Sequence, residues 1–265
     1  MNNVNKTLYI PLYGKAYVSS HGLFLHDPKA EQIWAAEGFA LKGKSKSKWL
    51  AYYMGIRSAV FDDWVRACIA SNPDDIVLHI GCGMDSRAER IGDHPLWYDV
   101  DFPEVIAERK RYFAETDAYK MLAGDARDCA FLAEIPQQKH AVVVMEGISM
   151  YMTHDELQNL FASLSAHFES VELLMDAYSE RAAKLSKYKN PINDVGVTQV
   201  WGIDDATVIE AGGIEFVRVH DMTPPHYIEQ LKGNEKRTFA GLYAGNFSRK
   251  LYRLYEYRKH TQETL

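Results

Sequence analysis

The stretch IVLHIGCGMDSR, residues 76–87, decides the fold. Residues 76–80 form a short run rich in β-branched and apolar side chains, which predicts a buried strand after the turn residues of 72–75. Gly81 and Gly83 follow at i and i+2, a spacing that allows a tight turn and lets a ligand approach the backbone closely. A strand that runs into such a turn is typical of nucleotide-binding α/β proteins, although two glycines also fit an ordinary strand-to-helix turn.

Short apolar runs and helical patterns alternate downstream of this turn. We expect further strands at 96–100, 119–123, 141–145, 171–177, 214–220 and 250–257. We expect helices at 103–115, which opens with a proline, and at 153–167, which opens with the Thr-x-x-Glu spacing of a capping box. Strands separated by helices predict a doubly wound, largely parallel sheet. The last two strands follow less helical sequence and are expected to close the sheet as an antiparallel hairpin.

Two segments do not fit the alternation. Residues 1–72 contain helical patterns and a lysine-rich stretch at 42–48, which we interpret as a solvated loop. Residues 179–199 mix a basic helical pattern with an Asn-Pro pair. We interpret 1–72 as an N-terminal helical cap and 73–265 as the core, with a second cap inserted at about 179–199. Both caps are expected to cover the carboxyl ends of the strands, where ligands bind in open α/β sheets.

Composition excludes several classes of protein. Apolar residues make up 47% of the 265 residues and charged residues 25%, as in soluble globular chains. A net charge of −6 gives no general attraction to nucleic acid or to an anionic membrane. The three cysteines form no CxxC pair, the histidines show no metal-ligand spacing, and no apolar run approaches the ~20 residues that span a bilayer. We therefore expect a cytoplasmic protein with no metal site and no nucleic-acid or membrane partner.

Acidic residues stand at the ends of the later strands. Asp99 and Asp101 end the second strand, where a carboxylate can accept hydrogen bonds from the ribose hydroxyls of an adenosine ligand. Asp101 also stands just before a predicted helix and could instead cap it. Asp125 follows the third strand, where it could meet an adenine or form an ordinary Asx turn. Glu146 ends the fourth strand, and because a lone buried charge is costly, we expect a ligand or a core salt bridge as its partner.

Four motifs in this order and spacing, GCGMDSR, WYDVDFPEVI, GDARD and EGISMYMT, resemble the leucine carboxyl methyltransferase family, which includes bacterial polyketide O-methyltransferases. The resemblance extends to residues 14–16, 27–30, 57–63 and 201–205 and to the tyrosine-rich C-terminal strand. It implies a class I methyltransferase that uses S-adenosylmethionine and releases S-adenosylhomocysteine. The implied fold is Rossmann-like, with a seven-stranded, mostly parallel sheet, an antiparallel last strand and an N-terminal helical cap.

The resemblance also implies roles for individual residues. Lys15 and Arg57 would meet the carboxylate of the methionine portion, and Gly81 with Gly83 would approach that portion through the backbone. The other implied donor contacts are Asp101 to the ribose, Asp125 with Ala126 to the adenine, and Glu146 to the amino group. Tyr151, together with Arg57, would stand at the methyl-transfer site.

Independent chemistry agrees with two of these roles. A guanidinium can bind a carboxylate with two parallel bonds, as Arg57 would do, and a carboxylate such as Glu146 can pair an ammonium. The alternative for Arg57 is an ion pair on the helix surface with Asp62 or Asp63, which are within one or two turns.

The sequence thus predicts an S-adenosylmethionine-dependent O-methyltransferase that acts on a carboxylate or phenolic hydroxyl of a small, polyketide-like molecule or of a peptide. Such an enzyme mainly aligns donor and acceptor and excludes water. A carboxylate needs no base, whereas a phenol does, and no residue stands out as a base. Two alternatives are an NAD-dependent oxidoreductase with the same glycine turn and a non-catalytic adenosine-binding protein. Ser86 in place of a third glycine disfavours the first, and the full set of donor residues disfavours the second.

Overall fold

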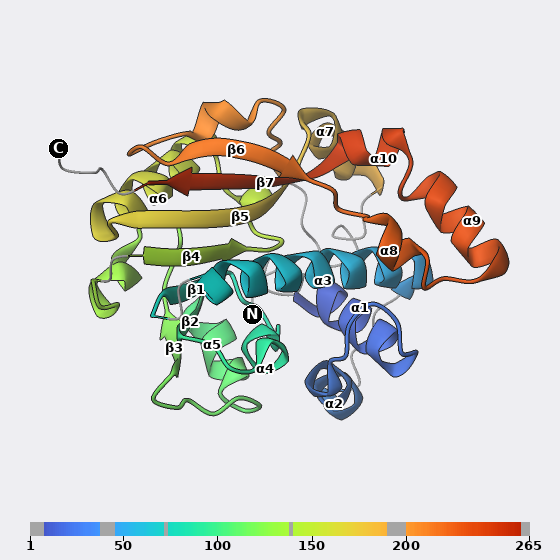
Figure 1. Ribbon diagram of the computed structural model, residues 1–265, viewed down its shortest axis with the longest axis horizontal. Helices are drawn as coiled ribbons and strands as arrows, with labels where there is room; N and C mark the ends of the chain where they lie inside the picture. Colours follow the sequence, from blue (N-terminus) through green and yellow to red (C-terminus); the bar gives the residue numbers. More distant parts are fainter. Residues whose placement is uncertain (1–7, 38–45, 72–73, 138–139, 190–199, 261–265) are drawn as a thin grey trace.

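A seven-stranded mixed sheet with helices on both faces forms the core of the protein (Figure 1). The computed structural model describes residues 8–37, 46–71, 74–137, 140–189 and 200–260. The strands, in their order across the sheet, are β3 (Tyr119–Ala123), β2 (Leu96–Asp101), β1 (Ile76–Ile80), β4 (His140–Met145), β5 (Ser170–Tyr178), β7 (Tyr252–Lys259) and β6 (Glu215–His220). The pairs β1–β2, β2–β3, β1–β4 and β4–β5 are parallel, and β7 pairs antiparallel with both β5 and β6. The arrows of β4 and β7 accordingly point in opposite directions in Figure 1.

The predicted fold is confirmed, but the last two strands differ from the expected hairpin. They do pair with each other, yet three short helices lie between them in the chain: α8 (Pro225–Ile228), α9 (Gly233–Leu242) and α10 (Asn246–Leu251). β7 therefore returns to a place between β5 and β6, and β6 stays at the edge. The first residues of the predicted last strand, 250 and 251, belong to α10.

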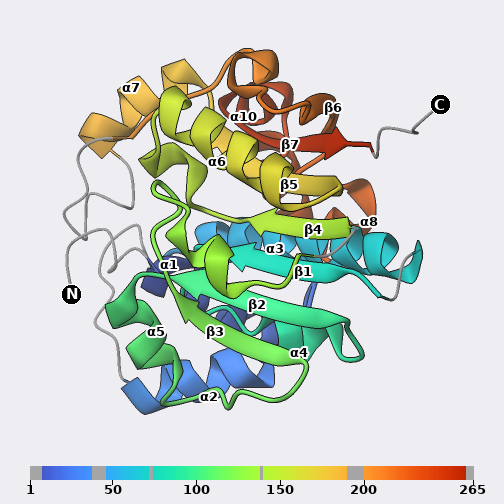
Figure 2. The same ribbon diagram turned by 90° about the vertical axis from the view of Figure 1, so that its left-hand side faces the viewer.

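The two faces of the sheet bury two separate apolar clusters. Alternate strand residues such as Val77 and Val142 pack with the N-terminal helices α1 (Tyr9–Ser20), α2 (Pro28–Glu37) and α3 (Lys48–Ser71). Their neighbours Leu78 and Val143 pack on the other face, with α6 (His154–His167) and the 3-10 helix η3 (Ala130–Glu134). This alternation follows from the period of two in a strand. α3 and α6 consequently lie on opposite faces of the sheet (Figure 2).

The helices follow the sequence signals closely where caps mark their ends. The predicted capping box is present, with Thr153 accepting from the backbone of Glu156 and the Glu156 side chain accepting from the backbone of Thr153. α5 (Pro103–Arg109) begins at the predicted proline but is shorter than expected. α4 (Arg87–Ile91) follows the glycine turn. Of two short 3-10 helices, η4 (Ser149–Tyr151) follows β4 and η6 (Ala206–Ile209) precedes β6.

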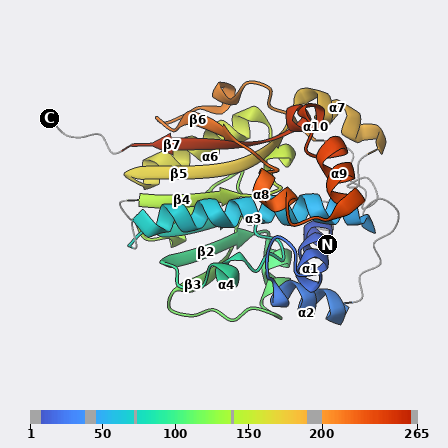
Figure 3. The same cartoon turned by 45° about the vertical axis from the view of Figure 1, so that its right-hand side comes forward.

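The two predicted caps contain helices: α1, α2 and α3 in residues 1–72, and α7 (Glu180–Lys189) in residues 179–199. α3 runs along one face of the sheet, and α1 packs against it (Figure 3). Lys42 and Lys44 of the predicted lysine-rich loop lie outside the described residues, as does the second half of the predicted cap at 179–199. Among the helices that the structure describes, none combines the length and the apolar character needed to cross a bilayer.

Candidate functional site

A cavity of about 870 Å³ opens at the carboxyl ends of the central strands. Its wall is built from α1, α3, the glycine turn, the segments that follow β2, β3 and β4, and parts of α7 and β7. All the residues predicted for the donor and methyl-transfer sites line it, namely Lys15, Arg57, Gly81, Gly83, Asp101, Asp125, Ala126, Glu146 and Tyr151. The fold therefore brings the predicted residues together, and their contacts with a ligand stay predictions.

The glycine turn brings the backbone to the cavity surface. Gly81 has φ +71°, which favours glycine, and a Cβ at this position would overlap the side chain of Ile148. The amide of Gly81 donates to the carbonyl of Val100 at 2.7 Å, which fixes the turn against β2. Both the left-handed φ and the close approach of Ile148 thus require glycine at this position, and both Gly81 and Ile148 line the cavity.

Asp101 holds the glycine turn rather than capping a helix. Its Oδ2 accepts from the amide of Gly83 at 2.7 Å, and its Oδ1 accepts from the amide of Phe102 at 2.8 Å. The N-cap residue of α5 is Phe102, and no side-chain cap bond forms there. Burial raises the pKa of Asp101. Asp99, the other candidate acid, lies instead in the core, where it binds Arg109, the hydroxyl of Tyr119 and the indole of Trp97.

Asp125 forms the Asx turn that was its alternative reading and also lines the cavity. Its Oδ1 accepts from the amide of Arg127 at 3.0 Å, and the Arg127 guanidinium binds both carboxylate oxygens. The hydrogen bond from this guanidinium lowers the pKa of Asp125. Arg127 also lies over the ring of Phe102, at 5.7 Å from its centroid, and both residues line the cavity beside Asp125. The sequence analysis did not single out Arg127 or Phe102.

Arg57 and Glu146 form a buried ion pair at the opposite end of the cavity. Nε and Nη2 of Arg57 contact Oε1 of Glu146 at 3.1 and 2.9 Å, and Nη1 contacts Asp176 at 2.8 Å and the hydroxyl of Tyr252 at 2.6 Å. Burial disfavours the charge on Glu146, but Arg57 and Arg87 outweigh burial and lower its pKa to about 2. Glu146 is therefore ionised at neutral pH.

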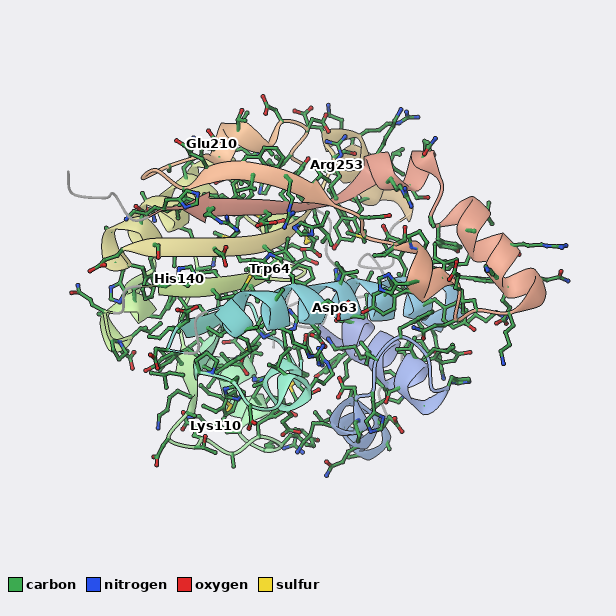
Figure 4. All side chains as sticks on the ribbon, in the orientation of Figure 1. Asp63, Trp64, Lys110, His140, Glu210 and Arg253 are labelled. Carbon is green, nitrogen blue, oxygen red and sulfur yellow. The ribbon has the colours of Figure 1, made fainter. Side chains whose placement is uncertain are left out.

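The alternative of a surface ion pair for Arg57 is wrong, because its side chain is buried. Asp62 binds Arg87 and Arg90 instead. Asp63, which Figure 4 labels on α3, accepts a hydrogen bond from the hydroxyl of Tyr227 at 2.6 Å. Lys15 is also buried, and its Nζ lies 3.2 Å from Oδ2 of Asp85.

Four residues of this charged end were missed by the sequence analysis as site residues. Arg87 and Asp85 belong to the quoted glycine-turn motif, so their position was a usable signal. Asp176 interrupts the apolar strand β5, and a charge inside an apolar strand is another. Tyr252, which lines the cavity and donates to Asp176, gave no signal beyond its place in a tyrosine-rich strand.

The strand order, the glycine turn after β1 and the acid at the end of β2 define a class I methyltransferase. The profile of leucine carboxyl methyltransferases matches residues 12–165, and the chain belongs to this family. It is therefore an S-adenosylmethionine-dependent methyltransferase, which sets aside the alternatives of an oxidoreductase and a non-catalytic protein.

The chain is similar in sequence to two methyltransferases and in fold to a third whose structure is solved. The chain is 30% identical over 190 residues, 70% of each chain, to the tetracenomycin polyketide synthesis O-methyltransferase TcmP of Streptomyces glaucescens. It is 26% identical over 234 residues to the S-adenosyl-L-methionine-dependent methyltransferase dpfgK of Gibberella zeae, with 79% of this chain and 78% of that protein covered. In fold it is similar to the magnesium protoporphyrin IX methyltransferase ChlM from Synechocystis with bound S-adenosylhomocysteine. The TM-score is 0.51 and the identity 13%, over 92% of this chain and 97% of that one.

Proposed function

We propose that the enzyme transfers the methyl group to an oxygen, either a carboxylate or a phenolic hydroxyl, of a small, largely apolar, polyketide-like molecule. The observation that carries this proposal is that one cavity combines a charged end with an aromatic wall directly beside it. Its volume of about 870 Å³ falls within the range of ~300–1,000 Å³ that is usual for small-molecule sites. The name of TcmP, an O-methyltransferase of polyketide synthesis, supports the same class of acceptor.

The charged end suits the amino-acid portion of the donor. Lys15 and Arg57 would hold the donor carboxylate, and Glu146 would pair the ammonium, since charge-assisted hydrogen bonds are the strong ones. Asp101 would accept from the ribose, and Asp125 would lie by the adenine. When bound, S-adenosylmethionine supplies an electrophilic methyl group on a sulfonium. The residues named here bind and orient it.

The aromatic wall beside the charged end suits a flat acceptor. The ring of Tyr252 lies 4.8 Å from that of Tyr178 and 6.1 Å from that of Tyr53, and all three residues line the cavity. Aromatic rings at such distances attract one another and would extend the same contact to an aromatic acceptor. α7 adds Leu185 to this wall, which agrees with the proposal that residues 179–199 cap the acceptor site.

The tyrosines of this wall favour an acceptor oxygen that is already ionised. Burial raises the pKa of both Tyr53 and Tyr252, so neither hydroxyl is a ready base at neutral pH. A carboxylate with a pKa near 4 is deprotonated before it binds, whereas a phenol near 10 has to lose a proton. Of the two acceptor oxygens the carboxylate is therefore the better supported, with Tyr151 as the residue that orients it.

A panel of hydroxynaphthoic acids tests this proposal, because each molecule offers both oxygens. We expect transfer of a labelled methyl group to give a methyl ester, seen by mass spectrometry and lost on mild alkaline hydrolysis. Because the carboxylate is ionised throughout, the rate should change little between pH 6 and 8. An alkali-stable aryl ether would assign the phenol instead. Transfer to a peptide carboxylate with none to the panel would contradict the small-molecule acceptor, and transfer to nitrogen would contradict O-methylation.

We also propose a cytoplasmic setting for the enzyme. The supporting observation is that Cys68, Cys82 and Cys129 are free, buried thiols, which fits a reducing compartment.

A further inference from the structure

Arg87 is a fully buried arginine that lies behind the charged end of the cavity. It is the first residue of α4, and its Nε donates to Oδ1 of Asp62 at 2.9 Å. Its Nη2 contacts two carboxylates at once, Oδ2 of Asp85 at 3.2 Å and Oε2 of Glu146. Its Nη1 has no hydrogen-bond partner among the described residues. Arg87 does not itself line the cavity, whereas Asp85 and Glu146 do.

These contacts make Arg87 the central residue of a buried series of ion pairs in which positive and negative side chains alternate. The series runs through Lys15, Asp85, Arg87, Glu146, Arg57 and Asp176. It links six separate parts of the fold: α1, the glycine turn, α4, the end of β4, α3 and β5. Lys15 with Asp85 forms one pair on the cavity wall and Glu146 with Arg57 forms the other, and Arg87 touches one member of each.

We propose that Arg87 is a positioning residue for the amino-acid end of the donor: it holds the carboxylate of Glu146 beside Arg57 by standing between Glu146 and Asp85. This inference rests on the proposed donor site. It assigns to Arg87 a role that acts through Glu146 and involves no contact with the donor.

The contacts of Arg90 show which of the Arg87 contacts is distinctive. Arg90 also binds Asp62, at 2.8 Å, and Asp85, at 2.7 Å, so these two carboxylates have another cationic partner. The ion pairs of Arg90 are with Asp27, Asp62 and Asp85, whereas Glu146 pairs with Arg87 and Arg57. A buried ion pair contributes little net stability, and the unpaired, buried Nη1 of Arg87 costs stability. A role in the site therefore explains the contact between Arg87 and Glu146 better than a contribution to fold stability does.

The electrostatics of Glu146 give the expected consequence of losing Arg87. The charged groups that face Glu146 are Arg57 on α3, Arg87 on α4, Lys15 on α1, Asp85 in the turn and Asp176 on β5, and the hydroxyl of Ser58 donates to it. Two buried carboxylates close together cannot both ionise readily. Without Arg87, burial and Asp85 would raise the pKa of Glu146, and a neutral acid would give up its charge pairing with the ammonium of the donor.

Calorimetric titration of full-length variants tests the inference with two ligands. S-adenosylhomocysteine carries the amino-acid portion, and 5′-methylthioadenosine lacks it. We expect Arg87→Met to weaken S-adenosylhomocysteine binding at least 30-fold at pH 6.5 and to change 5′-methylthioadenosine binding less than threefold. Any pH dependence of this loss should run toward a smaller loss at higher pH, because a higher pH favours the charged form of Glu146, whereas the wild-type affinity should stay flat. The S-adenosylhomocysteine affinity of Arg87→Lys should lie between those of the wild type and Arg87→Met, since an ammonium keeps the charge but is a single point charge.

Tyr257→Phe is the control for a change of stability alone. Tyr257 is buried, and its hydroxyl donates to the carbonyl of Ala206 at 2.9 Å, away from the cavity wall. This variant should melt earlier and bind both ligands as the wild type does. If Arg87→Met does not fold, Arg87→Lys decides the question by the same comparison.

Two results would overturn the role of Arg87: wild-type S-adenosylhomocysteine affinity in the Arg87 variants, or an equal loss for both ligands at every pH. Glu146→Gln separates this failure from a failure of the donor site. If Glu146→Gln loses S-adenosylhomocysteine and the Arg87 variants do not, the donor site stands and the inference about Arg87 falls. If Glu146→Gln itself binds S-adenosylhomocysteine as the wild type does, the proposed donor site is wrong.

Discussion

Replacing Arg57 by alanine is expected to weaken S-adenosylhomocysteine binding by at least a hundredfold, about 2.7 kcal/mol. The variant loses the group proposed to hold the donor carboxylate. It also leaves Glu146 and Asp176 without the guanidinium that contacts both of them. Truncating one partner of a buried, hydrogen-bonded charge pair costs roughly 2–5 kcal/mol, much of it because the other charge stays unpaired. Calorimetric titration of the full-length variant measures the affinity, and a thermal melt measures the stability.

Arg57→Lys should not restore this affinity. Nε, Nη1 and Nη2 of Arg57 contact Glu146, Asp176 and Tyr252, and one ammonium does not replace a planar fork with three separate donors. Arg66→Ala on the same helix is the matched control, because the Arg66 side chain is 47% exposed and lies 3.8 Å from Asp63, outside the cavity. It should bind the ligand as the wild type does. Full affinity in Arg57→Lys, or a lower melting temperature with unchanged binding in Arg57→Ala, would make Arg57 a structural residue.

Gly81→Ala is expected to abolish measurable donor binding and to lower the melting temperature. Its φ of +71° costs a residue with a Cβ roughly 1–2 kcal/mol, and displacing the overlapped side chain of Ile148 costs about 1–3 kcal/mol more. At about 2–4 °C per kcal/mol for a chain of this size, a thermal melt resolves the loss easily. Because Ile148 also lines the cavity, its displacement reshapes the wall where the donor lies.

Gly241→Ala is the control for the glycine substitution. Gly241 lies in α9, where a Cβ would meet nothing within 4 Å, so this variant should be neutral or more stable by roughly 0.4–1 kcal/mol. Adding Ile148→Ala to Gly81→Ala should restore part of the binding by removing the overlap. Wild-type binding in Gly81→Ala alone would show that the turn is a connection between strand and helix and not a ligand surface.

The parts of the fold that the sequence predicts are those with strong local signals. β1 has the predicted bounds, because a run of mostly β-branched and apolar residues ends at a glycine. The capping box marks the start of α6 equally well. The three helices between β6 and β7 were missed because they have 4, 10 and 6 residues, too short for a helical period to stand out. The place of β7 inside the sheet depends on pairing between distant strands, which no local pattern carries.

The site residues also divide into those that the sequence predicts and those that it does not. The predicted residues stand at strand ends or in the N-terminal helices, and the topology of a parallel sheet brings strand ends to one edge. The missed residues act through tertiary contacts: the charge of Asp176 inside a strand marks it as unusual, but its link to the site follows only from its contacts with Arg57 and Tyr252. For Asp101 the structure excludes the helix cap, because its carboxylate accepts from the amides of Gly83 and Phe102, and the ribose contact stays a prediction.

The role of residues 1–72 as a cap stays a proposal. The packing of α1 and α3 supports it, because both helices line the cavity and also pack against the sheet. α3 supplies Arg57 to the cavity and also packs Ile56 into the same apolar cluster as Val77 of β1. α1 supplies Lys15 and packs Leu12 into that cluster. Closure over the donor would then depend on helices that share the core of the sheet, so this cap is expected to fold together with the core.

A crystal structure of the full chain with S-adenosylhomocysteine tests the central claim most directly, namely that this cavity is the donor site with its charged end toward the amino acid. We predict the ribose hydroxyls on Asp101, the adenine beside Asp125, the carboxylate within reach of Arg57 and Lys15, and the ammonium on Glu146. The ligand in the reverse orientation, with its adenine at the Arg57–Glu146 pair, or bound outside the cavity, would contradict the claim.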